Sequence, residues 1–211
     1  MDEASARAWV EANLNVPRET MDRLDAFAAL LADENERQNL VSRASLDAIW
    51  SRHIADSAQL LRFGAAPTAT WADLGSGAGF PGLIVAALHS GPVTLIEERR
   101  LRVEFLQRAA ALLAVQVEIV AGKVERLRGR SFDVISARAF APLDRLLALG
   151  TGLSTTKTLW LLPKGRNAET ELAALDPSWQ GDFRLEASVT DPAAQIIVAE
   201  GVRRAAKGRR G

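Results

Sequence analysis

Hydrophobic positions in the first 63 residues recur every three or four residues, a spacing typical of amphipathic helices. One apolar stripe runs from Met21 to Leu31 and follows Pro17, which suits a first helical position. A second helical region follows Ser45, whose side chain is expected to cap its N-terminus. The pattern therefore predicts a helical cover that precedes the main domain.

Short runs of consecutive apolar residues then alternate with stretches of helical spacing. The expected strands cover residues 71–74, 93–96, 117–120, 132–137, 159–162 and 196–199. The expected helices cover residues 82–89, 99–113 and 142–149. Nearly continuous apolar strands are typical of parallel strands that helices cover on both faces. Alternation of strands and helices predicts an α/β fold with a doubly wound, mainly parallel sheet.

The end of the chain departs from this alternation. Residues 183–189 alternate between polar and apolar positions, and no helical stretch is evident between residues 159–162 and residues 196–199. We therefore expect the last two apolar runs to pair antiparallel at one edge of the sheet. The expected division is a helical cover (1–63), a main domain (64–202) and a basic tail (203–211).

Composition narrows the class of protein. A chain of 211 residues that is 48% hydrophobic can bury one good core. The absence of cysteine excludes disulfides and thiolate metal sites. No apolar run approaches the roughly 20 residues that cross a bilayer, and the acidic N-terminus lacks an apolar signal core. We therefore expect a cytoplasmic protein with no membrane partner and no metal ion.

The formal net charge is zero, but the charges are unevenly distributed. Five of the 26 basic residues lie in the last nine positions, which leaves 21 basic against 26 acidic residues elsewhere. A basic tail on a mildly acidic body suits a phosphate-rich partner such as RNA. A solvated terminus without a partner is the alternative interpretation.

A glycine-rich segment follows the first expected strand directly. Its glycines are Gly75, Gly77, Gly79 and Gly82. Such a turn lets the backbone approach a ligand closely and directs helix N–H groups toward it. Asp73 precedes the first glycine, and Glu97 closes the next apolar run. The arrangement predicts a cofactor that carries a nucleoside, with Asp73 facing an ammonium group and Glu97 accepting from ribose hydroxyls.

The glycines fit two cofactor patterns. Residues 77–82 match G-x-G-x-x-G, the dinucleotide fingerprint of an NAD(P)-dependent oxidoreductase. Read from Asp73, the segment is D-x-G-x-G-x-G, the pattern of S-adenosylmethionine-dependent methyltransferases. The second interpretation is favoured because Gly77 lies three residues past Leu74, and because Pro81 removes a helix N–H. A methyltransferase for a small molecule or a protein, and a non-catalytic RNA-binding protein, remain alternatives.

Several further segments carry a family resemblance. They are Asn-Leu-Val-Ser at 39–42, Arg-His-Ile-Ala-Asp-Ser at 52–57, the segment 73–82, Lys-Val-Glu at 123–125, Ser-Ala-Arg-Ala-Phe-Ala at 136–141 and Pro-Lys-Gly at 163–165. In this order the chain resembles the bacterial small-subunit (16S) ribosomal RNA guanine-N7 methyltransferase family (RsmG, formerly GidB). The resemblance implies a Rossmann-like class I methyltransferase fold with an antiparallel edge strand, preceded by N-terminal helices. It also implies S-adenosylmethionine as cofactor and small-subunit ribosomal RNA or the 30S subunit as partner.

The resemblance also implies individual cofactor contacts. They fall on Gly75, Phe80, Val124, Glu125 and Arg138. Asp73, Gly77, Gly79 and Glu97, taken from the glycine-rich segment, complete the expected cofactor site. One departure is visible, since Ala137 stands between Ser136 and the arginine that matches the family motif. Ser136 is therefore given no role.

The implied reaction limits the catalytic chemistry. N7 of guanine carries a lone pair and no proton, so its methylation requires neither an acid–base residue nor a nucleophile, only positioning. Arg138, Arg52 and Lys164 are expected to position cofactor and RNA. His53 is expected to be structural, bonded to Asp56 or to the backbone. We expect a monomer, although no residue pattern decides the oligomeric state.

Overall fold

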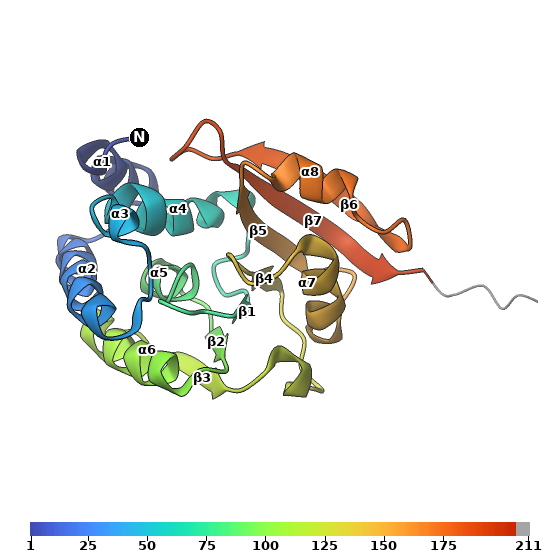
Figure 1. Cartoon of the computed structure of the whole chain (residues 1–211), viewed down its shortest axis with the longest axis horizontal. Coiled ribbons are helices and arrows are strands. Elements are labelled where there is room, and N and C mark those ends of the chain that lie inside the picture. The colour runs from blue at the N-terminus through green and yellow to red at the C-terminus, as the bar shows by residue number, and fades with distance from the viewer. Residues whose placement is uncertain (206–211) are drawn as a thin grey trace, which may run out of the picture.

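Within residues 1–205, which the computed structural model describes, the chain forms one seven-stranded sheet (Figure 1). The strands are β1 (Trp71–Leu74), β2 (Val93–Glu97), β3 (Val117–Ala121), β4 (Val134–Ser136), β5 (Leu159–Gly165), β6 (Trp179–Ala187) and β7 (Gln195–Arg204). Their order in the sheet is β3-β2-β1-β4-β5-β7-β6. The first five strands pair parallel, and β7 pairs antiparallel with both β5 and β6. The prediction of a mainly parallel sheet with an antiparallel edge is confirmed.

Helices cover both faces of the sheet (Figure 1). The α-helices are α1 (Glu3–Leu14), α2 (Arg18–Gln38), α3 (Arg43–Leu46), α4 (Ala55–Ala58), α5 (Gly82–Leu88), α6 (Arg100–Leu113), α7 (Leu143–Gly150) and α8 (Ala168–Ala173). Shorter helical turns are η1 (Trp50–Ile54), η2 (Gln59–Phe63), η3 (Val124–Arg126) and η4 (Thr151–Leu153). The N-terminal helices pack with α5 and α6 over one face, while α7 and α8 cover the other.

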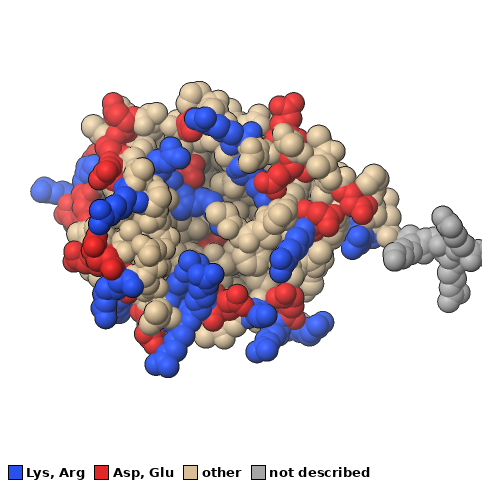
Figure 2. All heavy atoms as spheres, in the orientation of Figure 1, with Lys and Arg blue, Asp and Glu red and all other residues tan. Residues whose placement is uncertain are grey.

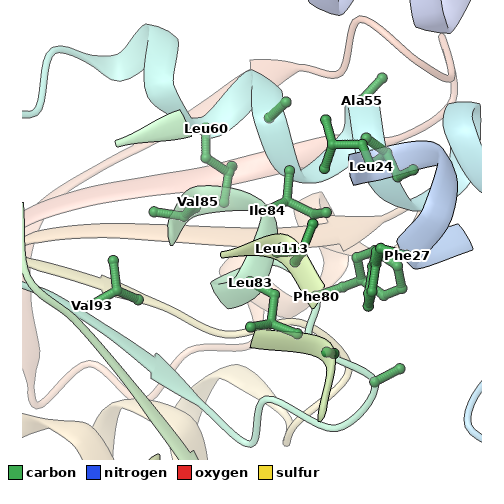
Figure 3. Close-up of a cluster of buried hydrophobic side chains, with 14 of the residues drawn as sticks. Leu24, Phe27, Ala55, Leu60, Phe80, Leu83, Ile84, Val85, Val93 and Leu113 are labelled. Carbon is green, nitrogen blue, oxygen red and sulfur yellow. The ribbon is translucent and has the colours of Figure 1, made fainter. Parts of the chain in front are cut away.

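Side chains alternate between two cores along each central strand. On β1, Trp71 packs into the core under the N-terminal helices, whereas Ala72 and Leu74 pack into the core under α7. Figure 3 shows the first of these cores, where Phe80 lies against Phe27 of α2. The two rings meet edge to face at 5.5 Å between centroids. This contact anchors the end of the glycine-rich segment to the helical cover.

Three details differ from the sequence-based expectation. Ser42, rather than Ser45, caps α3 and accepts a hydrogen bond from the Ser45 amide at 3.3 Å. Helix α8 lies between the last two predicted strands, and its six residues are too few to produce a periodic signal. Strand β7 continues through Arg204, so the expected boundary of the basic tail falls inside a strand. The tail's other basic residues lie outside the described residues.

None of the helices within residues 1–205 combines the length and the apolar character that a transmembrane segment needs.

Candidate active site

A cavity of about 1450 Å³ opens at the carboxyl ends of β1 and β4, which are adjacent strands. The chain leaves β1 toward β2 on one side and leaves β4 toward β5 on the other. Such a reversal of strand order is where doubly wound sheets bind ligands. The glycine-rich segment forms one wall and residues 138–142 form another. Figure 2 shows this face hollowed, with Lys and Arg side chains in and around the hollow.

The glycine-rich segment is fixed to β2 through its backbone. The amide of Gly75 donates to Ile96 O at 2.9 Å, and the amide of Gly77 donates to Glu97 Oε2 at 2.9 Å. Gly75 has φ of +70° and Gly77 has φ of +55°, in the region that favours glycine. A Cβ atom at Gly75 would lie 2.3 Å from Phe140 Cδ2, so that position requires the absence of a side chain.

Asp73 does not face the cavity as expected. It is fully buried, its Oδ2 accepts from the Gly82 amide at 3.1 Å and its Oδ1 accepts from Ser136 Oγ at 2.9 Å. Burial raises the pKa of Asp73 to about 6, although hydrogen bonds from Ser76, Ser136 and Gly82 oppose the rise. The carboxyl group acts on the cavity indirectly, because it ties the start of α5 to β1 and β4.

Ser136, which the sequence did not single out, links the side chains of Trp71 and Asp73. Its hydroxyl accepts from Trp71 Nε1 at 2.9 Å and donates to Asp73, and all three side chains are fully buried. Asp73 and Ser136 are direct partners in the β1–β4 register. The sequence does hold one indication of this role, because Ser136 is a polar residue inside an apolar strand. A buried hydroxyl group needs hydrogen-bond partners, so such a residue is expected to bond to other buried polar groups.

Glu97 lies at the carboxyl end of β2, where the sequence predicts a ribose contact. The residue is 4% exposed, and its Oε1 accepts from the Arg99 amide at 2.9 Å. Arg102, which lines the cavity, lies 3.8 Å from Oε2, the oxygen that holds Gly77. The carboxylate therefore shapes the glycine-rich segment, and its contact with ribose stays a prediction.

Val124 and Glu125 lie further from the cavity. They form η3 after β3, which is two strands away from β1 in the sheet. Val124 is buried and Glu125 is exposed, and neither lines the cavity. Their contact with the cofactor stays a prediction.

Arg138 joins the cavity to the helical cover. Its Nη1 donates to Arg52 O at 2.9 Å and to Asp56 Oδ2 at 3.3 Å, and its Nη2 bonds to His53 Nδ1 at 2.7 Å. The guanidinium group also lies 5.1 Å from the centroid of the Phe80 ring. Phe80 is only 4% exposed, so its ring is held within this cluster. The arginine is thus held rigidly by partners from residues 52–56.

His53 is bonded to Arg138 rather than to Asp56 or the backbone. Since arginine only donates, His53 Nδ1 must accept, which places the ring proton on Nε2. Burial lowers the pKa of His53 to about 3, and the charges of Arg138 and Arg52 add to this effect. The ring stacks on Phe80 with 4.7 Å between centroids. His53 is therefore neutral near pH 7 and cannot serve as a proton acceptor through Nδ1.

Lys164 braces the wall of the cavity opposite the helical cover. Its Nζ donates to Ala141 O at 3.0 Å and to Glu171 Oε2 at 2.8 Å, and its side chain is 7% exposed. Glu171 also accepts from the Leu143 amide at 2.9 Å. Lys164 thus fixes the segment that follows Arg138.

The cavity carries more positive than negative charge. Its basic residues are Arg52, Arg102, Arg138, Lys164 and Arg166, and its acidic residues are Asp56, Glu171 and Asp191. Arg52 and Arg166 are exposed, whereas Asp56 pairs with Arg138 and Glu171 pairs with Lys164. Within residues 1–205, no group of three or more His, Cys, Asp or Glu side chains could hold a metal ion.

Comparisons with known proteins agree with this geometry. The family model "GidB: rRNA small subunit methyltransferase G" matches residues 20–195. The chain is 50% identical over 215 residues to ribosomal RNA small subunit methyltransferase G of Rhizorhabdus wittichii, covering 100% of this chain and 98% of the relative. It is 48% identical over 207 residues to the protein of that name from Zymomonas mobilis, covering 94% of each. The solved structure of MtNAS in complex with S-adenosylmethionine shares the fold at a TM-score of 0.58 and 15% identity, covering 96% of this chain and 85% of the other.

Proposed function

The chain belongs to the rRNA small subunit methyltransferase G family, and from this premise we propose that it transfers a methyl group from S-adenosylmethionine to N7 of a guanine in small-subunit ribosomal RNA. Family membership makes it a methyltransferase of 16S ribosomal RNA. The NAD(P)-dependent oxidoreductase alternative is thereby set aside. The strand order agrees, since an antiparallel β7 between β5 and β6 departs from the 3-2-1-4-5-6 order of dinucleotide-binding domains. We propose further that the protein acts as a monomer in the cytoplasm.

The strongest support for the proposal is the composition of the cavity, which lies where the strand order reverses between β1 and β4. A glycine-rich wall suited to close backbone contact faces a wall that bears Arg138 and Lys164. Pockets for small molecules usually measure roughly 300–1,000 Å³. A cavity of about 1450 Å³ has room for a nucleoside cofactor and a nucleobase side by side.

The residues at this edge fit the cofactor. The backbone of Gly75 and Gly77 forms a surface without side chains, and Glu97 at the end of β2 is placed to accept from ribose hydroxyls. Val124 and Glu125 follow β3, beyond Glu97 in the strand order, where the base of the cofactor would lie. When bound, S-adenosylmethionine supplies a methyl group on a positively charged sulfur. Asp73 supports the same site by holding Gly82 and β4 together.

The neighbouring groups suit an acceptor that has no proton to lose. His53 is neutral and its Nδ1 is occupied by Arg138, so neither residue is available as a base. Asp56 and Glu171 offset the charges of Arg138 and Lys164. This balance limits repulsion of the positive charge that develops on the purine. The cavity then acts through proximity and orientation, which can supply several kcal/mol of the barrier.

The exposed cations suit contacts with the RNA backbone. Arg52 and Arg166 line the cavity with exposed side chains. The planar guanidinium group matches phosphate geometry. We therefore assign Arg52 to RNA positioning through its side chain, while its carbonyl oxygen holds Arg138.

Transfer of labelled methyl from S-adenosylmethionine to three substrates tests the proposal. The substrates are 30S subunits, protein-free small-subunit RNA and bulk tRNA. Label in one of the first two, and not in tRNA, is the expected result. Arg52→Ala should reduce transfer about tenfold or more without changing the unfolding midpoint, whereas Arg62→Ala, an exposed arginine outside the cavity, should retain transfer. Cofactor binding without label in either ribosomal substrate would contradict the proposal.

A further inference from the structure

Phe140 lies directly beside the glycine-rich segment. It follows β4 by four residues, and its half-buried ring lines the cavity. The ring packs so closely on Gly75 that a Cβ atom there would lie 2.3 Å from Phe140 Cδ2 and 3.0 Å from Cε2. Because β1 and β4 are adjacent, the ring stands at the point of the sheet edge where cofactor and substrate must meet.

The segment around Phe140 is held on both sides. Arg138 before it is bonded to Asp56, and the carbonyl of Ala141 after it accepts from Lys164. Between them, Ala139 has φ of +51°, a conformation that costs a non-glycine residue roughly 1–2 kcal/mol. These contacts fix the ring at the cavity wall through bonds to the helical cover and to β5.

Phe140 differs from the other aromatic rings of this cavity. Phe80 is nearly buried, with His53 stacked on its ring and Arg138 over it. In residues 1–205, no aromatic ring or guanidinium group stacks on Phe140. One side of Phe140 contacts Gly75, and the ring is still partly exposed to the cavity. Phe140 also packs against the core under α7. Its remaining exposed surface is available to a planar partner from the cavity, whereas the ring of Phe80 is covered.

We propose that Phe140 is the platform on which the target guanine stacks during methyl transfer. The inference rests on the proposed function, since it requires that a nucleobase enters the cavity. Every nucleobase offers a flat π surface, and stacking on an aromatic side chain contributes without any proton transfer. A base held flat on Phe140 lies beside the Gly75 backbone, which brings N7 near the cofactor. Phe140 is thus a substrate-positioning residue.

Variants that separate ring character from apolar volume test this role. Phe140→Leu and Phe140→Met keep an apolar side chain and remove the π surface, whereas Phe140→Tyr and Phe140→Trp keep it. Loss of one base–aromatic stack predicts a fall in kcat/KM for ribosomal RNA of about 5- to 150-fold in the first pair. The second pair should stay within about threefold of the wild type. Phe183→Leu on β6, also half-buried, is the matched control and should retain kcat/KM.

Measurement of cofactor binding separates a role of Phe140 toward the base from a role toward the cofactor. The dissociation constant of S-adenosylmethionine, measured by equilibrium binding, should be unchanged in Phe140→Leu, because the ring serves the base. An equal loss of cofactor affinity would overturn the proposal and make Phe140 a cover for the cofactor. Unchanged kcat/KM in both Phe140→Leu and Phe140→Met, with an active wild type, would also overturn it. An inactive wild-type protein would refute the proposed function itself, a failure distinct from either of these. If Phe140→Leu does not fold, Phe140→Met supplies the same comparison.

Discussion

Replacement of Ser136 by alanine removes one oxygen atom at the junction of β1, β4 and α5. In the native protein this oxygen accepts from Trp71 Nε1 and donates to Asp73 Oδ1, both at 2.9 Å. Asp73 in turn accepts from the Gly82 amide at the start of α5. The substitution therefore leaves a buried indole N–H without a partner and deprives a buried carboxyl group of a donor.

The expected cost follows from these two losses. A buried donor left unsatisfied costs about 1–3 kcal/mol, and a hydrogen bond to a charged group contributes about 1.5–3 kcal/mol. Because the two losses share one network, they are not fully additive. We expect Ser136→Ala to lower the free energy of unfolding by about 2–4 kcal/mol. The pKa of Asp73 should rise further, since one of the hydrogen bonds that lowers it is lost.

Urea unfolding of the wild type and the variant measures this change. Ser154→Ala is the control, because Ser154 is half-buried and its Oγ donates only to Thr151 O at 3.2 Å. The control should lose less than about 1 kcal/mol. A loss for Ser136→Ala no larger than that of the control would show that the hydroxyl does not stabilise the junction, and would refute the reasoning.

Two further predictions concern the glycine-rich segment and the pH dependence of stability. Gly75→Ala should abolish cofactor binding, since φ of +70° and overlap with Phe140 both oppose a side chain. Gly77→Ala should cost only about 1–2 kcal/mol, because a Cβ atom there would make only ordinary contacts at 3.7 Å and the strain comes from φ of +55°. Equilibrium binding of the cofactor and urea unfolding compare the two variants. The contribution of neutral His53 to the free energy of unfolding is fully present above pH 6.5. It is lost at about 1.4 kcal/mol per pH unit as the pH falls toward the pKa of His53, about 3 in the folded protein. Asp73 acts in the opposite direction, because its stabilisation is present below pH 3.8 and is lost as pH rises through its pKa of about 6. The free energy of unfolding of Asp73→Asn, measured between pH 6 and pH 4, should therefore fall more steeply toward acid than that of the wild type. Equal dependence on pH in the two proteins would contradict the raised pKa of Asp73.

The parallel part of the sheet could be predicted because its signals are local. Continuous apolar runs marked β1 to β5, and the glycines after Leu74 marked the turn into α5. The cap of α3 and the presence of α8 could not be predicted, because neither leaves a local pattern in the sequence. Ser42 and Ser45 are equally good capping residues in isolation, and only the placement of α3 on the fold selects Ser42. Helix α8 is shorter than two turns and leaves no periodic pattern.

Several residues that line the cavity could be named from the sequence, but their contacts could not. The motif nominated Arg138, yet its partners His53 and Asp56 come from a segment more than 80 residues earlier in the chain. Likewise, Asp73 was expected at the ligand because it ends a strand beside glycines. Its burial depends on the register of β1 with β4, which brings Ser136 opposite it. Such pairings arise from tertiary packing, which no single segment encodes.

The position of the transferred methyl group shows whether guanine N7 is the acceptor. Small-subunit RNA methylated by the protein would be treated with borohydride and aniline, which cleave the chain at N7-methylguanine, and the fragments would be mapped. We expect a single new cleavage site that requires S-adenosylmethionine and the protein together. Incorporated methyl without cleavage would place the methyl on another atom and contradict the assignment of guanine N7 as the acceptor.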